Sequence, residues 1–255
     1  TSLNREDVRN WDVSLIASLW KKRLNISASY YHTTAKDVVQ AVPVTPIAGI
    51  ENMYVNGATL LNTGFEFDAN LTLIEKKDFG FTIGGNLSTL KNEVKSLNNI
   101  DQKITTAPYG MTLITQVGGS PYDFYGHQFN GVISNAAEAS RLNLTDFKNL
   151  PFEAGDAIFE DINKDGIIDK DDRKSLGNAL PKFYGSGFID VRFKKLTLRG
   201  YVTFSKGNKM YNAVRRSLED MSSYRNQSTA ILNRWQEEGQ VTAIPKATYA
   251  DPMGN

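Results

Sequence analysis

The sequence contains no cysteine, and this absence excludes a disulfide-bonded scaffold and every metal site built from thiolates. It also contains no stretch close to the ~18 consecutive apolar residues of a membrane-spanning helix. Membrane-spanning strands are not excluded in this way, because their side chains alternate and their mean hydropathy is low. The cell compartment therefore stays open at this point.

An excess of charge of one sign is lacking as well. Lys and Arg number 29 and Asp and Glu number 28, so the net charge gives no reason to expect a nucleic-acid partner. The 255 residues suffice for one large domain or two small ones. Both ends of the sequence resemble the interior of a longer chain, so we expect a fragment of a larger protein.

Residues arranged for catalysis are also lacking. The two histidines, His32 and His127, lie in different segments and have no nucleophile motif beside them. We expect His32 at the end of a strand, on the surface or a rim. Acidic pairs such as Glu66 and Asp68 lie on one face of a predicted strand, which indicates a polar surface and not a general acid and base. We predict that the chain is not an enzyme.

Three pairs of segments carry apolar residues at every second position, which predicts three β-hairpins. The pairs are 11–20 with 24–31, 65–73 with 79–88, and 189–193 with 196–205. Within each pair the connection is short and charged, whereas the connections between pairs, 33–62 and 92–185, are long. In the second long connection we expect strand-like pieces over 112–117 and 124–133 and a helix over 136–143. Further helices are expected over 211–221 and 229–237.

Two architectures produce strands of this kind. A soluble β-sandwich alternates in the same way. An outer-membrane barrel additionally has short turns at one end, long loops at the other and strands of ~9–11 residues. Charges at mid-strand, as at Asp190 and Arg199, are costly in a packed core but not in a wet lumen. The pattern favours the barrel and leaves the sandwich, acting as a carbohydrate-binding module, as the alternative.

One twelve-residue stretch, 161–172, has the oxygen spacing of an EF-hand calcium loop. Calcium takes about 6–8 oxygen ligands from a tightly wrapped chain. Gly166 permits the sharp turn, and Ile168 provides an apolar anchor. The predicted ligands, with the Ile167 carbonyl among them, are Asp161, Asn163, Asp165, Ile167, Asp169 and Asp172.

The calcium loop has a simpler alternative, which is a solvated acidic turn. Position twelve is Asp172, whose arm is shorter than that of the usual Glu, so we expect modest affinity. The preceding residues, 155–160, read as extended, which indicates a lone structural loop and not a paired calcium sensor. If the loop lies outside the cell, binding in the ~10⁻⁴–10⁻³ M range suffices.

Aromatic residues fall into two groups. Tyr122, Phe124 and Tyr125 are candidates for stacking on a ligand, although packing inside folded loops explains them equally well. The second group lies near predicted strand ends, where aromatic girdles meet a membrane interface. Its members are Trp11, Trp20, Tyr30 and Tyr31.

Several segments carry recognisable motifs. Residues 61–71 (LNTGFEFDANL) contain the strand motif N-x-G-F-E, and residues 86–94 look like a strand that follows it. Two further segments are residues 121–132 (PYDFYGHQFNGV) and 155–172 (GDAIFEDINKDGIIDKDD), and residues 176–187, 212–216, 233–235 and 244–247 continue the series. In this order, the segments resemble those of the SusC/RagA-type TonB-dependent outer-membrane transporters.

The resemblance implies an all-β fold, an antiparallel transmembrane β-barrel segment with long extracellular loops and short helices. Residues 1–255 then form part of a ~22-stranded barrel without its plug and final strands, and 155–178 form an extracellular loop. It also implies import of oligosaccharides, or of peptides, across the outer membrane of a Bacteroidota-like Gram-negative cell. The implied partners are a SusD-like lipoprotein, TonB through the plug, outer-membrane lipid and the ligand, but no nucleic acid.

Overall fold

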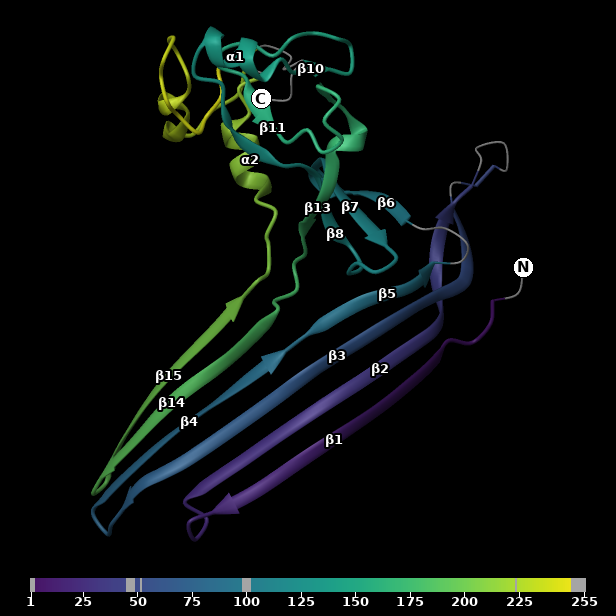
Figure 1. The fold of residues 1–255 in the computed structure, drawn as a ribbon. Helices are drawn as coiled ribbons and strands as arrows, with labels where there is room; N and C mark the ends of the chain where they lie inside the picture. The colour runs from purple at the N-terminus through teal and green to yellow at the C-terminus, as the bar shows by residue number, and fades with distance from the viewer. Residues whose placement is uncertain (1–2, 45–48, 51, 98–101, 223, 249–255) are drawn as a thin grey trace. The chain divides into compact units, whose positions relative to one another are not determined.

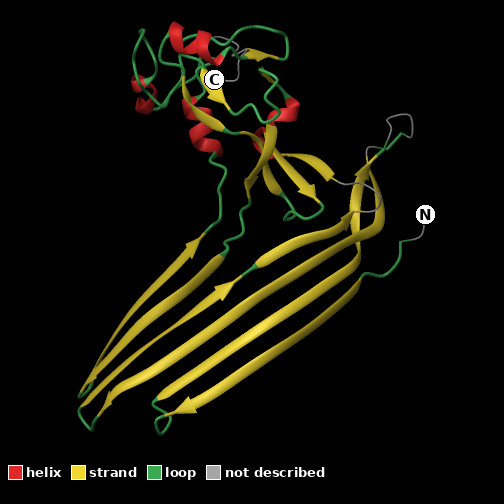
Figure 2. Ribbon diagram, viewed as in Figure 1, coloured by secondary structure: helices red, strands yellow, loops and turns green. Residues whose placement is uncertain are grey.

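A computed structural model describes the chain over residues 3–44, 49–50, 52–97, 102–222 and 224–248. The chain forms two units. The first consists of residues 1–105, 113–123 and 177–210, and the second of residues 106–112, 124–176 and 211–255. Every helix among the described residues belongs to the second unit (Figure 2). None of these helices combines the length and the apolar character that a membrane crossing needs.

The first unit is built on a seven-stranded antiparallel sheet. Six strands follow one another in the order β1–β2–β3–β4–β14–β15 (Figure 1). β3 pairs with β4 over Glu66–Glu75 and with β5 over Ala58–Thr63. The strands are β1 (Asp7–Leu19), β2 (Leu24–Pro43), β3 (Asn52–Glu75), β4 (Phe79–Thr89), β5 (Lys91–Leu97), β14 (Phe183–Phe193) and β15 (Leu196–Lys206).

The three predicted hairpins are confirmed. They are β1–β2, β3–β4 and β14–β15, and they are joined by residues 20–23, 76–78 and 194–195. Alternating apolar side chains predict such strands because successive side chains point to opposite faces of a sheet. The pairing of β4 with β14 brings together segments that are about 100 residues apart in the sequence.

The predicted long connection over residues 33–62 was wrong. Residues 33–43 continue β2 and residues 52–62 begin β3, and the two segments pair with bulges on either side of Val38. Backbone hydrogen bonds hold strands together whether or not the side chains alternate, so a strand can run beyond its apolar part. His32 therefore lies inside β2 and not at the end of a strand. Residues 45–48 and 51 lie outside the described residues.

The remaining elements are short. A four-stranded sheet has the order β13–β8–β7–β6, and two pairs are formed by β9 with β11 and by β10 with β12. The strands are β6 (Gln102–Ala107), β7 (Met111–Gln116), β8 (Asp123–His127), β9 (Phe129–Val132), β10 (Thr145–Asp146), β11 (Ala157–Phe159), β12 (Ile167–Ile168) and β13 (Arg173–Gly177). The helices are α1 (Ala136–Leu142), α2 (Ala213–Glu219) and the 3₁₀ turns η2 (Pro108–Gly110), η3 (Lys170–Asp172) and η4 (Thr229–Asn233).

The predicted helix over 136–143 is confirmed as α1, which is capped at both ends. The Asn135 side chain accepts a hydrogen bond from the Glu138 N–H at 2.9 Å, and Asn143 ends the helix in the left-handed conformation. The Ser134 backbone N–H, followed by its hydroxyl, holds the pKa of the Glu138 carboxyl below its ordinary value. Beneath α1, Ile133, Phe152 and Ile168 form the buried core of the second unit.

The helices predicted near the C-terminal end are shorter than expected. The first is α2, and the second is only the 3₁₀ turn η4. The backbone N–H of Trp235 donates to the Ile244 carbonyl at 2.9 Å, and its indole N–H donates to the Ser134 carbonyl at 3.1 Å. These tertiary hydrogen bonds hold Trp235 outside the helix, so context overrides local propensity.

Candidate functional site

The seven-stranded sheet has one polar face. Cross-strand partners on this face include Ser14 with Ser29, whose hydroxyls are 2.9 Å apart, and Asp190 with Arg199. The Arg199 Nε donates to an Asp190 oxygen at 3.0 Å. The Asn70 amide donates to the Asp68 carboxylate at 2.8 Å on the same face. These side chains form hydrogen bonds and an ion pair with one another in rows across the strands. Together they make a continuous polar surface that is suited to contact with water.

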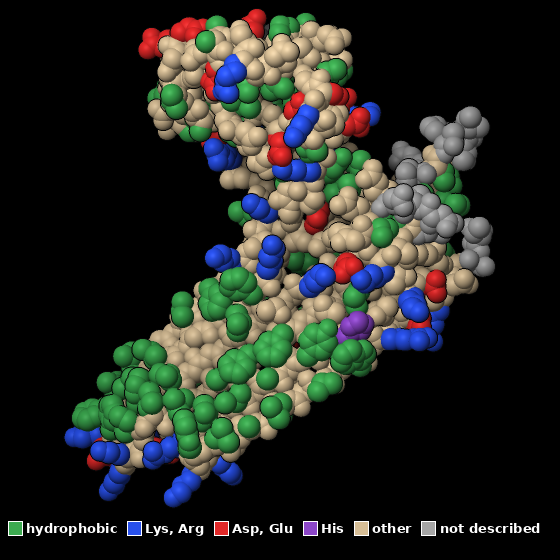
Figure 3. Space-filling model, viewed as in Figure 1, with side chains coloured by type: hydrophobic (Ala, Val, Ile, Leu, Met, Phe, Trp, Pro, Cys, Tyr) green, Lys and Arg blue, Asp and Glu red, His purple; other side chains and the backbone are tan. Residues whose placement is uncertain are grey.

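The opposite face is apolar from β1 to β15. The strand register aligns its side chains in rows, because paired residues in a sheet point to the same side. One row runs Leu19, Leu24, Leu71, Ile83 and Ile189. Large side chains of this face remain exposed, among them Leu15 at 70% and Leu196 at 69%. Figure 3 shows hydrophobic side chains gathered over these strands.

The exposed apolar rows exclude the alternative of a soluble β-sandwich for this sheet. A sandwich buries its apolar rows against a second sheet. In the first unit a buried cluster lies elsewhere, where Ala58 contacts Val94 and Leu97 with Val38 and Leu60 around them. An apolar area of this size, left open to the surroundings, marks a surface that contacts a partner or a membrane.

The apolar face has the height of a bilayer core. Its rows run from Val13, Tyr30 and Phe65 at one end to Phe79, Phe193 and Leu196 at the other. Along a strand this distance is roughly 34 Å, at about 3.4 Å per residue. Strands tilted by ~45° span about 24 Å in height, close to the ~25 Å apolar band of membrane barrels.

Aromatic residues of the predicted girdle divide between the two faces. Trp11 lies on the apolar face, 5.6 Å from the ring of Tyr30 and stacked at 5.1 Å on His32, its cross-strand partner. Tyr31 points to the polar face, because it alternates with Tyr30 along β2. Its hydroxyl donates to the Thr89 carbonyl at 3.4 Å. Tyr31 thus covers the strand at Gly64 instead of facing outward.

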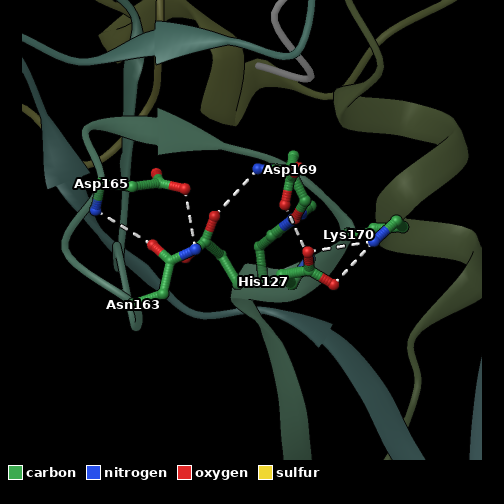
Figure 4. Close-up of polar contacts among 7 residues, drawn as sticks. His127, Asn163, Asp165, Asp169 and Lys170 are labelled. Carbon is green, nitrogen blue, oxygen red and sulfur yellow. Dashed lines mark hydrogen bonds and ion pairs between the residues drawn. The ribbon is translucent and has the colours of Figure 1, made fainter.

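The predicted calcium loop is tightly wrapped. The Asp161 carboxylate accepts hydrogen bonds from the N–H groups of Lys164 at 2.6 Å and Gly166 at 2.8 Å. Asn163 and Asp165 contact each other and the backbone of the turn (Figure 4). Each carboxylate oxygen has two lone pairs, so an oxygen that accepts one N–H can also approach a cation.

The loop closes on a buried carboxylate. Asp172 is 0% exposed, and its two oxygens accept the N–H groups of Ile162 at 2.8 Å and Asp169 at 2.9 Å. The expected apolar anchor, Ile168, lies in the core and belongs to β12, which pairs with β10. β11 precedes the loop as an extended segment, as expected.

A histidine fastens the loop from outside. The His127 Nε2 donates to the Asp169 carbonyl at 2.6 Å (Figure 4). The centre of its ring lies 5.6 Å from that of the Phe159 ring. Beside it, the hydrogen bond to Asp171 raises the pKa of Lys170. Over the part of the chain that the structure describes, no group of three or more histidine or acidic side chains is placed to hold a metal ion. The calcium ligand set therefore stays a prediction.

The three candidate stacking aromatics do not share a surface. Tyr122 precedes β8, is 63% exposed and has a positive φ of 60°. Phe124 and Tyr125 are consecutive residues of β8, so their side chains point to opposite faces of that strand. At most one of these two rings can line a surface together with Tyr122, and their role in ligand binding stays a prediction.

One polar cluster was not found from the sequence. Lys246 places its ammonium 3.2 Å from the carboxylate of Asp156, which is 2% exposed. Lys246 borders a cavity of about 700 Å³ that Phe152 and Trp235 also line. Residues 244–247 carry only a family-like motif, and a contact across 90 residues has no local signal in the sequence.

Comparison with known proteins gives a consistent result. Residues 1–201 match the protein family described as "TonB dependent receptor-like, beta-barrel". TonB-dependent receptor P3 of Formosa agariphila is 27% identical over 252 residues, 96% of this chain and 24% of that protein. TonB-dependent receptor P26 of the same organism is 27% identical over 96% of this chain and 25% of its own length. The chain thus spans about a quarter of the relatives that it matches.

A solved structure has the same fold. The RagAB peptide transporter superposes with a TM-score of 0.75 at 20% identity, over 95% of this chain and 26% of its own. At this identity the likeness concerns the fold alone. It agrees with the predicted antiparallel barrel segment and with the two-faced sheet.

Proposed function

The chain belongs to the family of TonB-dependent-receptor-like β-barrels, and on this premise we propose that it forms part of the barrel wall of an outer-membrane importer. Receptors of this family are transporters of the Gram-negative outer membrane and not enzymes, in agreement with the sequence prediction. In this proposal the apolar face of the sheet contacts lipid, and the polar face lines the path of the ligand.

The observation that carries the proposal is the continuity of the two faces. From the row of Leu15, Ala28 and Phe67 to the row of Phe193 and Leu196, one face carries only apolar side chains and glycine. The rows of the other face are joined by hydrogen bonds and by the Asp190–Arg199 ion pair. A soluble protein has little reason to expose such an apolar face. A membrane barrel requires it.

We further propose that the imported ligand is an oligosaccharide or a peptide, captured with a SusD-like surface lipoprotein and moved by energy from TonB. The fold of the RagAB peptide transporter supports the peptide alternative, and the resemblance of the sequence motifs supports both. Import of labelled peptides and oligosaccharides by cells that express the full-length protein distinguishes the two classes of ligand. Uptake that does not depend on TonB would contradict the proposal.

The lipid-facing assignment predicts opposite effects at two adjacent residues. Val202 lies on the apolar face at mid-height and is 63% exposed, whereas Thr203 pairs with Ser186 on the polar face. Val202→Arg is expected to destabilise the full-length protein in phospholipid vesicles by about 2–4 kcal/mol, because the charge enters the bilayer centre. Urea-induced unfolding measures this change.

Thr203→Arg is the matched control, since it adds the same side chain one residue away in the same strand. It is expected to change the free energy of unfolding by less than about 1 kcal/mol, because its charge enters a wet lumen. Equal losses in the two variants would exclude the proposed orientation of the sheet.

We also propose that residues 155–178 form an extracellular loop stiffened by a calcium ion. The support is the wrapping of the loop backbone around the carboxylates of Asp161 and Asp165, which accept N–H groups of the turn. Carboxylate oxygens are the hard ligands that calcium prefers. Asp161, Asn163, Asp165, Asp169 and Asp172, with the Ile167 carbonyl, would hold the ion. The ion adds no chemistry and serves to fasten the loop.

Calcium is expected to protect this loop from proteolysis. With a dissociation constant of ~10⁻⁴–10⁻³ M, about 10 mM calcium stabilises the loop by about 1.4–2.7 kcal/mol. Asp165→Ala is expected to abolish this protection. Asp171→Ala is the control, because Asp171 pairs with Lys170, is 61% exposed at its side chain and is not a predicted ligand. If calcium does not change the cleavage rate of the parent protein, the proposal of a calcium site in this loop is wrong.

A further inference from the structure

The three short turns of the seven-stranded sheet carry an unusual amount of positive charge. Their basic residues are Lys21, Lys22, Arg23, Lys76, Lys77, Lys194 and Lys195. The acidic residues beside them are Asp78 in the second turn and Glu75 at the end of β3, and all nine side chains are exposed. Barrel closure requires turns, but it does not require that these turns be cationic.

The turns form one connected edge. The Lys194 N–H donates to the Asp78 carbonyl at 2.7 Å, which joins the second turn to the third. The Thr72 N–H donates to the Arg23 carbonyl at 2.8 Å, which joins the first turn to β3. The basic side chains therefore emerge side by side along a single edge of the sheet.

This edge directly borders the apolar face. Leu19, Phe193 and Leu196 flank the turns and are 47%, 53% and 69% exposed. The Lys194 ammonium lies 5.5 Å from the centre of the Phe193 ring, so this side chain bends back along the apolar face. Figure 3 shows Lys and Arg side chains at the end of the hydrophobic area. An ammonium in this place stands at the depth of lipid headgroups.

The backbone of the turns argues against a purely conformational role for the lysines. Lys21, Lys22 and Lys194 have positive φ angles of 57°, 68° and 54°. Glycine or asparagine adopts this conformation at lower cost, and hairpin turns favour them there. The turn geometry therefore does not explain lysine at these positions, whereas a use for the charge does.

We propose that the three basic turns bind the headgroup phosphates of anionic phospholipids in the leaflet next to them. The inference rests on the proposed membrane orientation, in which short turns face the periplasm. Clusters of four to eight Lys and Arg residues beside a membrane-spanning segment attract anionic lipid in this way. The turns anchor the barrel wall at a fixed depth and gather anionic lipid around it.

The test uses the full-length protein in vesicles of phosphatidylcholine with spin-labelled phosphatidylglycerol or spin-labelled phosphatidylcholine. The fraction of label that the protein immobilises gives the relative affinity for the two lipids. We expect the parent protein to prefer phosphatidylglycerol by about fivefold or more at low salt, and by less at about 1 M salt. A preference of unity at low salt would overturn the inference.

A variant with glutamine at Lys21, Lys22, Lys194 and Lys195 is expected to reduce the preference to below about twofold. The matched control carries glutamine at four exposed basic residues of the second unit, namely Arg141, Lys148, Lys164 and Lys170. It is expected to keep the preference of the parent. Equal behaviour of the two variants would contradict the assignment to the turns.

Lys194→Gly distinguishes an effect of the lysine charge on lipid binding from an effect on the stability of the turn. Glycine relieves the positive φ, so the variant is expected to unfold at an equal or higher temperature and yet to bind less phosphatidylglycerol. An unchanged lipid preference in this variant and in the fourfold glutamine variant means that the lysines do not bind lipid. Normal insertion without any lipid preference refutes this inference alone, whereas failure to insert into either lipid also refutes the proposed function.

Discussion

Gly64→Ala is expected to prevent stable assembly of the sheet, with a loss of about 4 kcal/mol or more in the free energy of unfolding. A Cβ atom at Gly64 would meet the Thr89 carbonyl oxygen and the Tyr31 ring well inside 3.0 Å, a separation that real Cβ atoms essentially never show. The Tyr31 side chain can turn away, but the Thr89 oxygen belongs to the backbone of the sheet. Relief therefore requires β3 and β4 to separate. Urea titration of the folded protein in vesicles measures the loss.

Gly187→Ala is the matched control for this prediction. It makes the same change in the same sheet, but the nearest atom to the new Cβ is the Val202 Cγ1 at 3.7 Å, which is ordinary contact. Its effect is expected to stay below about 1 kcal/mol. The double variant Gly64→Ala with Tyr31→Ala removes only the movable obstacle, so it is expected to remain unstable. Its recovery to parental stability would show that Tyr31, and not the strand spacing, sets the requirement for glycine.

The contact between Tyr31 and Gly64 shows what the sequence could not predict. The alternation of apolar side chains predicts that both residues lie on strands, and it also predicts the three hairpins. Which side chain covers which glycine depends on the register between strands, and that register spans 33 residues. The N-x-G-F-E motif marked Gly64 by resemblance without giving a physical reason, and the register supplies it.

The error at residues 33–62 has a related cause. Apolar side chains alternate only in the part of a strand that has an apolar environment on one face and a polar environment on the other. Above the apolar band β2 and β3 continue as a paired ribbon, and β5 joins β3 there through Thr63 and Lys91. Neither face of that ribbon has to be continuously apolar, so the sequence carries no alternation to detect.

The sequence predicts more of the conformation of the calcium loop than of the placement of the aromatic residues. Its contacts are local, because Asp161 reaches Lys164 and Gly166 within five residues. Spacing alone therefore fixes much of the wrapping. The fastening of the loop by His127 and the pairing of β12 with β10 involve distant segments, and no spacing rule reveals them.

Asp172→Ala is expected to unfold this loop even without calcium. Two backbone N–H groups, of Ile162 and Asp169, lose the buried carboxylate oxygens that accept them. Hydrogen bonds to a charged group contribute about 1.5–3 kcal/mol each, so the loss of two is expected to reach about 3–6 kcal/mol locally. Hydrogen exchange of the loop amides in the presence of a chelator measures this loss without any contribution from a metal ion.

The control again is Asp171→Ala, which removes the neighbouring carboxylate from an exposed position where it pairs only with a flexible lysine. Its effect in the chelator is expected to be below about 1 kcal/mol. Asp172 thus has two separable roles, a structural one that persists in the chelator and a proposed metal-binding one that appears on adding calcium. Equal exchange rates in the two alanine variants under chelation would mean that the buried carboxylate does not hold the loop. The calcium proposal would then lose the preformed wrapping on which it depends.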